Sequence, residues 1–87
     1  MRSITYSKKA KDALLRMPAT DARRIRGKIE QYAADPSSQA NNSRRLQGLD
    51  YFRLRVGDWR VIFREDGVVI DVVRIAPRGA AYEGLER

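Results

Sequence analysis

The sequence predicts a single α+β domain in which a two-helix hairpin packs on a small, mainly antiparallel sheet. With 87 residues, 43% of them hydrophobic, the chain can form one modest core but not a second domain. Between residues 8 and 34, apolar side chains recur at spacings of three and four, which is typical of helices. From Leu46 onward the period changes to two, with glycines between the apolar runs, which is typical of strands. We therefore treat residues 1–87 as one domain.

The first half of the chain predicts one strand and two helices. Residues 2–6 alternate polar and apolar side chains, and Ser7 can cap the helix that follows. The apolar stripe of that helix is Ala10, Ala13, Leu14 and Met17. Pro18 interrupts the pattern, and a second helix is predicted from Ala19, with the inner face Ala22, Ile25, Ile29, Tyr32 and Ala33. Asp35-Pro36 ends it, because proline lacks the backbone donor and the residue before it resists the helical region.

The second half predicts three strands in a meander after a polar loop over residues 39–43. Gly57-Asp58 suits a two-residue hairpin loop, with glycine supplying the unusual backbone angle at the first position. Residues 68–75 are apolar on both faces, as expected for a central strand that is covered on each side. Residues 76–82 form a short tail that can fold over the end of the sheet.

The register of the predicted hairpin separates apolar side chains from charged ones. Val56 faces Trp59, Leu54 faces Val61 and Phe52 faces Phe63, which makes one face of the hairpin a core face. The same register places Arg55 opposite Arg60 and Arg53 opposite Ile62 on the other face. Like charges directly opposite each other are destabilising, and a bound anion would remove the conflict. The alternative is a solvated face with ion pairs to Asp50, Asp58 or Asp71.

The composition points to a phosphate-rich partner and excludes several kinds of chemistry. There are 18 basic and 11 acidic residues, and 14 of the basic ones are arginine, whose planar fork matches phosphate oxygens. A solvated surface rich in arginine is the alternative interpretation. Without cysteine or histidine the chain has no thiolate nucleophile, no Ser-His-Asp triad and no histidine base, and a zinc site is not expected. We predict neither a metal nor another cofactor.

No run approaches the roughly 20 apolar residues of a membrane span, and residues 1–11 contain no apolar run resembling a secretory signal. We therefore expect a cytoplasmic protein without a membrane partner.

Two consecutive segments form a recognisable pattern, Arg44-Arg45-Leu46-Gln47-Gly48-Leu49 and, directly after Asp50, residues 51–63. They resemble the lysine-leucine-glycine and arginine-valine-glycine-aromatic-arginine-isoleucine core of the RelE/ParE superfamily of bacterial toxins. The ending from Arg74 to Tyr82 fits in the same order, so the resemblance covers nearly the whole chain. It implies a β-α-α-β-β-β fold, a type II toxin–antitoxin pair and a cognate antitoxin as partner.

In RelE-like members the resemblance implies metal-independent cleavage of messenger RNA on the ribosome, by attack of a ribose 2′-hydroxyl on the adjacent phosphate. The implied catalytic residues are Arg60, Arg78 and Tyr82. The implied RNA- and phosphate-binding residues are Arg45, Tyr51, Arg53 and Arg55. Alternatively, Arg78 is only a loop charge, and Tyr82 is a packing lid over Val73 and Ile75.

Two departures from the superfamily's pattern affect proton transfer. Pro77 stands where many relatives carry histidine, and Tyr51 where some carry lysine. Because arginine has a pKa above about 12 and is a poor proton shuttle, Tyr82, Tyr51, Glu65 or a ribosomal group would have to move protons. A ParE-like toxin that binds DNA gyrase and has no nuclease activity is one alternative. A catalytically weakened toxin that acts with its antitoxin in autorepression is another.

Overall fold

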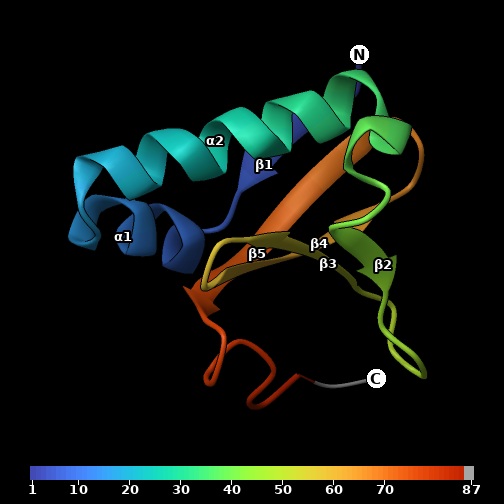
Figure 1. Cartoon of the computed structure of the whole chain (residues 1–87). Coiled ribbons are helices and arrows are strands. Elements are labelled where there is room, and N and C mark those ends of the chain that lie inside the picture. The colour runs from blue at the N-terminus through green and yellow to red at the C-terminus, as the bar shows by residue number, and fades with distance from the viewer. Residues whose placement is uncertain (86–87) are drawn as a thin grey trace.

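The computed structural model describes residues 1–85 and has the predicted α+β architecture (Figure 1). Its elements follow in the order β1 (Ser3–Tyr6), α1 (Lys8–Arg16), α2 (Ala19–Ala34), a 3-10 turn η1 (Pro36–Gln39), β2 (Ser43–Arg45), β3 (Phe52–Val56), β4 (Trp59–Glu65) and β5 (Val69–Pro77). The last two residues, 86 and 87, lie outside the described part of the chain.

The helices begin and end where the sequence signals lie. The hydroxyl of Ser7 accepts a hydrogen bond from the Ala10 amide (3.1 Å) and donates one to the carbonyl of Val73 (2.9 Å), which ties the start of α1 to β5. Pro36 initiates η1, and the predicted loop over residues 39–43 begins at the last residue of η1, Gln39, which is buried, and continues as a turn up to β2. The side-chain amide of Gln39 donates to Gln31 Oε1 at 2.9 Å.

The sheet has the strand order β1-β5-β4-β3-β2, with β1 parallel to β5 and every other neighbouring pair antiparallel. The predicted hairpin register is confirmed: Phe52, Leu54 and Val56 lie opposite Phe63, Val61 and Trp59. Gly57 adopts the expected positive φ, +57°. Strand β2 was not predicted; it pairs with β3 and extends the sheet by one edge strand.

The register of β4 and β5 shifts between Ile62 and Phe63, where the partners change from Arg74 to Val72. Val73 is therefore an extra residue in β5, as in a β-bulge. The shift keeps Val72 and Ile75 on the core side of the sheet and places Arg74 on the other side. As predicted, β5 is an interior strand with neighbours on both sides.

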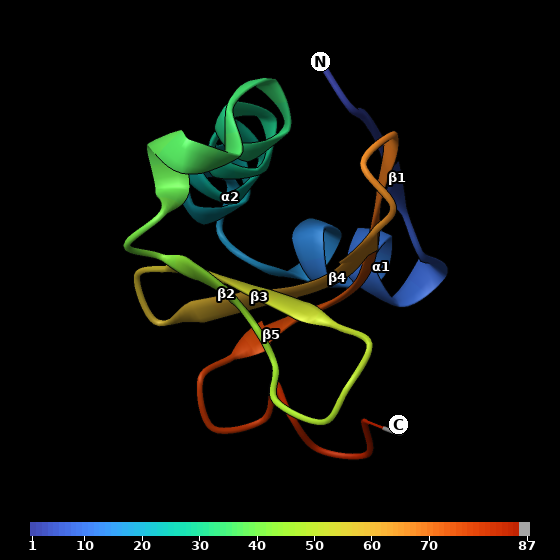
Figure 2. The ribbon, with the colours of Figure 1, turned by 90° about the vertical axis from the view of Figure 1, so that its right-hand side faces the viewer.

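The core lies between the helices and one face of the sheet, and the C-terminal segment crosses the opposite face (Figure 2). The buried cluster joins both helices to β3, β4 and β5: Ala10, Leu14, Met17, Ile25, Ile29, Tyr32, Ala33, Leu54, Val56, Val61, Phe63, Ile70, Val72 and Ile75. Ile62 and Ala81 are also fully buried but lie outside this cluster. Residues 78–84 form turns rather than a helix. Among residues 1–85, no helix is both long and apolar enough to span a bilayer.

Candidate nucleic-acid interface

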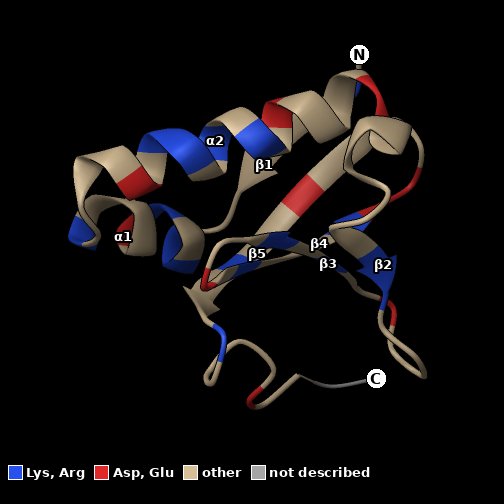
Figure 3. Ribbon diagram, in the orientation of Figure 1, with Lys and Arg blue, Asp and Glu red and all other residues tan. Residues whose placement is uncertain are grey.

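The face of the sheet turned away from α2 carries six arginines, which we call the arginine face: Arg44, Arg53, Arg55, Arg60, Arg64 and Arg74. Residues paired across neighbouring strands project on the same side of a sheet. One row therefore runs from Arg44 through Arg53 and Ile62 to Arg74, and a second joins Arg55 to Arg60. Figure 3 shows these basic positions along β2, β3 and β4.

No ion pair neutralises these six arginines within residues 1–85, where the four ion pairs join Arg2 to Glu65, Lys8 to Asp12, Arg24 to Asp21 and Arg45 to Asp50. The structure therefore does not support the alternative in which these arginines pair with carboxylates. Asp71, the carboxylate opposite Arg64, accepts a hydrogen bond from Thr5 at 3.0 Å instead. The Nε of Arg53 is buried and has no hydrogen-bond partner among the described residues. The arginine face thus carries uncompensated positive charge.

Arg60 lies at the base of this face rather than at its surface. Its side chain is buried, and its Nη1 donates to the carbonyls of Gly57 (2.9 Å) and Trp59 (3.0 Å). Arg60 therefore braces the hairpin turn, a structural role that the sequence did not predict. Its Nε and Nη2 make no hydrogen bond within the described chain, so the guanidinium keeps donors for a ligand.

Arg55 and Arg53 complete the centre of the face. Arg55 is exposed, and its Nη2 donates to Asn41 O at 3.2 Å and lies 3.4 Å from Asn42 Oδ1, so the side chain leans over the β2 edge. Arg53 is half-buried between Arg44 and Ile62, its partners on the neighbouring strands. The two arginines therefore remain close to each other on one strand, as the sequence predicted.

At the far end of the face, Tyr51 pairs with Arg64. The Tyr51 hydroxyl accepts a hydrogen bond from Arg64 Nη2 at 3.1 Å, and the Arg64 guanidinium lies 4.8 Å from the centre of the Tyr51 ring. Arg45 is not part of the arginine face. It lies opposite Phe52 on the helix side of the sheet, with its guanidinium 5.9 Å from the Phe52 ring centre and 3.8 Å from Asp50.

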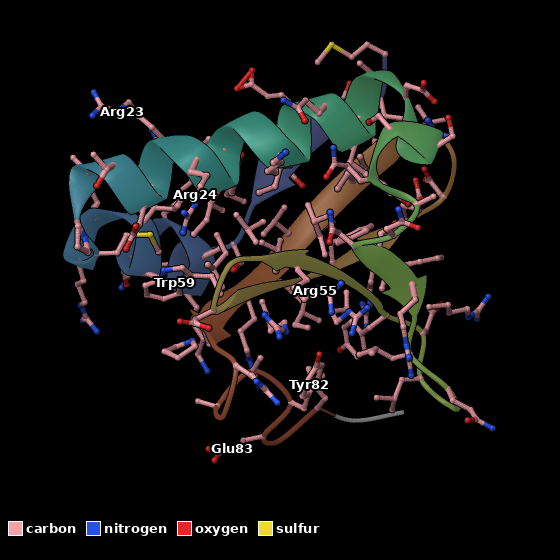
Figure 4. All side chains as sticks on the ribbon, in the orientation of Figure 1. Arg23, Arg24, Arg55, Trp59, Tyr82 and Glu83 are labelled. Carbon is pink, nitrogen blue, oxygen red and sulfur yellow. The ribbon has the colours of Figure 1, made fainter. Side chains whose placement is uncertain are left out.

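The C-terminal segment carries the remaining two predicted residues, Arg78 and Tyr82, and is held to the hairpin turn and to Arg74 of the arginine face. The backbone amide of Arg78 donates to Asp58 O at 2.9 Å, beside the hairpin turn, and Arg74 Nη1 donates to Ala81 O at 3.1 Å and to Glu83 O. Ala81, not Tyr82, is the buried residue of the segment. The side chain of Tyr82 is 42% exposed and points toward the sheet, whereas Glu83 points away (Figure 4).

The carboxylate of Glu65 lies on the opposite side of the sheet. It accepts a hydrogen bond from Tyr32 and pairs with Arg2 Nε at 3.1 Å. Burial and the contact with Glu65 raise the pKa of Tyr32 above its ordinary value. The Glu65 carboxylate is therefore held by Tyr32 and Arg2 on the helix side of the sheet, where it cannot transfer protons at the arginine face. No cluster of three potential metal ligands of the His, Cys, Asp and Glu types occurs in residues 1–85.

Three residues of the arginine face, Arg44, Arg64 and Arg74, were not predicted from the sequence. Arg64 could have been found, because extending the predicted register by one pair places it opposite Tyr51. Arg44 depends on β2, whose three residues carry too little periodicity to be recognised as a strand. Arg74 depends on the register shift at Val73, which reverses the side chain relative to a regular strand.

Comparison with known proteins agrees with this fold. A family model described as the ParE toxin of type II toxin–antitoxin systems, parDE, matches residues 4–82. A chain in the crystal structure of the archaeal RelE–RelB complex of Pyrococcus horikoshii is 28% identical with a TM-score of 0.76, covering 92% of this chain and 98% of that one.

Two more distant structures share the fold alone. A chain of the RelB–RelE complex of Methanococcus jannaschii is 22% identical with a TM-score of 0.73, over 94% of this chain and 99% of that one. YafQ of Escherichia coli is 17% identical with a TM-score of 0.61, over 92% and 97%. No curated protein sequence gives a significant match. Because the family model spans nearly all of the chain, this protein belongs to the ParE toxin family, within the RelE/ParE superfamily of type II toxin–antitoxin toxins.

Proposed function

We propose that this toxin is an endoribonuclease that cleaves messenger RNA bound to the ribosome. The observation that carries the proposal is the arginine face, where six guanidinium groups lie on one side of the sheet without a carboxylate partner among residues 1–85. Phosphodiester groups are the ligands that several adjacent arginines bind best, through paired N–H donors. A single small carboxylate would satisfy only one of them.

In the proposed reaction the ribose 2′-oxygen forms a bond to the adjacent phosphorus, and the bond from phosphorus to the 5′-oxygen of the next nucleotide breaks. The 2′-hydroxyl loses its proton to a base, and the departing 5′-oxygen gains one. Negative charge builds on the non-bridging phosphoryl oxygens, where Arg53 and the remaining donors of Arg60 would stabilise it. Arg55 and Arg78 would hold neighbouring phosphates, and this positioning supplies part of the rate.

For proton transfer we favour Tyr82 among the chain's own groups. Its side chain is partly exposed and points toward the sheet, whereas the Tyr51 hydroxyl already accepts a hydrogen bond from Arg64. The chain has no histidine, so the second proton would pass through water or a ribosomal group. No metal and no other cofactor enters this proposal.

A cognate antitoxin is the second proposed partner. The similar chains from Pyrococcus horikoshii and Methanococcus jannaschii were solved as RelE–RelB complexes. On this chain Leu15 of α1 is 79% exposed, and such an apolar side chain among basic residues suits an amphipathic antitoxin segment with acidic flanks. The antitoxin would cover the helices and the arginine face. Action on the ribosome would place the toxin in the cytoplasm.

A second candidate function is binding of DNA gyrase without nuclease activity. Pro77 occupies the position before Arg78 where many RelE-like nucleases carry histidine, and the family model that matches is named for ParE. The arginine face does not discriminate, since it would serve either polyanion binding or an acidic protein surface. The two functions differ in what happens to RNA.

Sequencing of RNA 5′ ends after induction of the toxin without its antitoxin tests the proposal. We expect cuts within translated codons for the wild type and for Arg23→Gln, whose side chain points away from the sheet (Figure 4). We expect no cuts for Arg53→Gln, which is preferable to an Arg60 variant because Arg60 also braces the turn. Intact transcripts together with DNA damage would contradict cleavage and indicate gyrase. Intact transcripts without damage would indicate a weakened toxin that acts in autorepression.

A further inference from the structure

A cavity of about 390 Å³ lies between α1 and the second half of β5, outside the centre of the arginine face. It exists because β1 pairs with β5 only as far as Val72. Beyond that point Ser7 turns the chain, with its amide on Val72 O (2.8 Å), and α1 takes the place of a strand beside β5. The lining residues are Lys9, Asp12, Ala13 and Arg16 of α1 and Arg74 and Ile75 of β5.

The lining of the cavity carries a net positive charge. Lys9, Arg16 and Arg74 contribute three positive charges against one carboxylate, that of Asp12. The Asp12 carboxylate lies 3.8 Å from Lys8 Nζ, which offsets its charge further. Ala13, which is half-buried, and Ile75, which is buried, complete the lining between the charged side chains of α1 and β5. An anionic group therefore matches this lining.

Arg74 belongs both to the cavity and to the arginine face. It ends the row that begins with Arg44 and Arg53, and it also lines the cavity. Its Nη1 is held by the carbonyls of Ala81 and Glu83, while its Nε and Nη2 have no hydrogen-bond partner within residues 1–85. The guanidinium is therefore oriented before any ligand binds, which lowers the entropy cost of binding.

We propose that this cavity is a second phosphate subsite, which takes a neighbouring phosphodiester of the RNA strand whose backbone lies on the arginine face. The proposal rests on the proposed nuclease function. Lys9 and Arg16 place an ammonium and a guanidinium group on α1. Arg74 lies in both sites, so a single RNA strand would pass from the arginine face to the edge of α1. The subsite fixes the register of the strand relative to the phosphate that is cleaved.

The test measures binding of a short single-stranded 2′-O-methyl RNA, which has no 2′-hydroxyl to attack, over a series of salt concentrations. Each phosphate contact contributes about 0.7 to the slope of log affinity against log salt for a single strand. We expect the double variant Lys9→Ala/Arg16→Gln to lose about 0.7 or more of this slope. The matched control Lys11→Ala/Arg23→Gln removes two charges from exposed helix positions outside the cavity and should keep the wild-type slope.

The outcomes separate the two proposals. If the cavity variant keeps the full slope while Arg53→Gln lowers it, the cavity is not an RNA subsite and the arginine face still is. If the wild type shows no salt-dependent RNA binding, the subsite is overturned, whereas the nuclease proposal stands or falls with the mapped RNA 5′ ends. A titration with inorganic phosphate, monitored through the amide chemical shifts of Lys9 and Arg16, distinguishes a site for free phosphate from a subsite for RNA. Saturation by free phosphate that the RNA does not displace would overturn the subsite.

Discussion

Arg55 and Arg60 lie directly opposite each other on β3 and β4, yet Arg55 is exposed and Arg60 is 8% exposed. The difference arises because Arg60 Nη1 turns back to the carbonyls of Gly57 and Trp59, whereas Arg55 extends over the β2 edge toward Asn41. One arginine of the pair thus supports the turn, and the other faces solvent.

We therefore expect Arg60→Met to lower the free energy of unfolding by about 1–3 kcal/mol, because two carbonyls lose a buried donor. Arg55→Gln should change it by less than about 0.5 kcal/mol, as at an exposed position. Urea denaturation of both variants measures the difference. Equal stabilities would mean that the Arg60 hydrogen bonds do not support the hairpin.

The pairing of Arg44 with Arg53 should depend on salt. Opposed like charges cost about 0.2–1 kcal/mol, so Arg44→Thr should stabilise the fold by a similar amount at low ionic strength. The gain should shrink at high salt, where exposed charges are screened. Thermal unfolding at two salt concentrations tests this, with Arg23→Thr as a control on α2. A gain that persists at high salt would point to strand propensity rather than repulsion.

Gly57 and Gly27 should respond oppositely to the same substitution. Gly57→Ala forces a side chain into the left-handed region at φ +57°, where its Cβ would also meet Arg24 Nη2 at 2.8 Å, so we expect a loss of about 1–2 kcal/mol. Gly27 lies within α2 with nothing within 4 Å of the added Cβ, so Gly27→Ala should gain about 0.5–1 kcal/mol. Urea unfolding compares the two. A stabilising Gly57→Ala would contradict the turn geometry.

Tyr32 should make the fold sensitive to high pH. Burial, followed by the hydrogen bond to Glu65, raises the pKa of Tyr32 in the folded state, although Arg2 opposes this. Above the ordinary tyrosine pKa of about 10, the unfolded chain releases this proton and the folded chain retains it, so stability is lost as the pH rises further. Tyr32→Phe should flatten this fall.

Tyr6 also has a raised pKa, chiefly from burial, so part of the fall should remain in the Tyr32 variant. Unfolding by urea at several pH values above about 9 provides the measurement. Tyr82→Phe serves as a control, because Tyr82 lies outside the buried cluster that contains Tyr32. An alkaline decline as steep in Tyr32→Phe as in the wild type would assign the effect to other groups.

Tyr82→Phe separates catalysis from packing. Because Tyr82 is 42% exposed and Ala81 is the buried residue of the segment, removal of the hydroxyl should change stability by less than about 0.5 kcal/mol. If the hydroxyl transfers a proton, cleavage should fall by about 100-fold or more. Counting cleaved transcripts after induction measures this. Undiminished cleavage would mean that the Tyr82 ring contributes only by stacking or packing.

Much of the fold followed from local patterns. The two helices, their boundary at Pro18 and the register of Phe52 against Phe63 could be predicted because helical and strand periodicities depend on neighbouring residues. The side-by-side position of Arg53, Arg55 and Arg60 followed from the same register. Strand β2 and the parallel docking of β1 on β5 could not, because both depend on contacts between distant segments.

The sequence by itself determined that arginines would gather on one face of a hairpin, since a two-residue turn fixes which side chains share a side of a sheet. Only the tertiary structure decided which arginines are available to a ligand. Burial of Arg60 under the turn, the addition of Arg44 and Arg74 from distant strands, and the cavity beside α1 all arise where separate elements meet. Such contacts depend on packing in space, which periodicity along the chain does not encode.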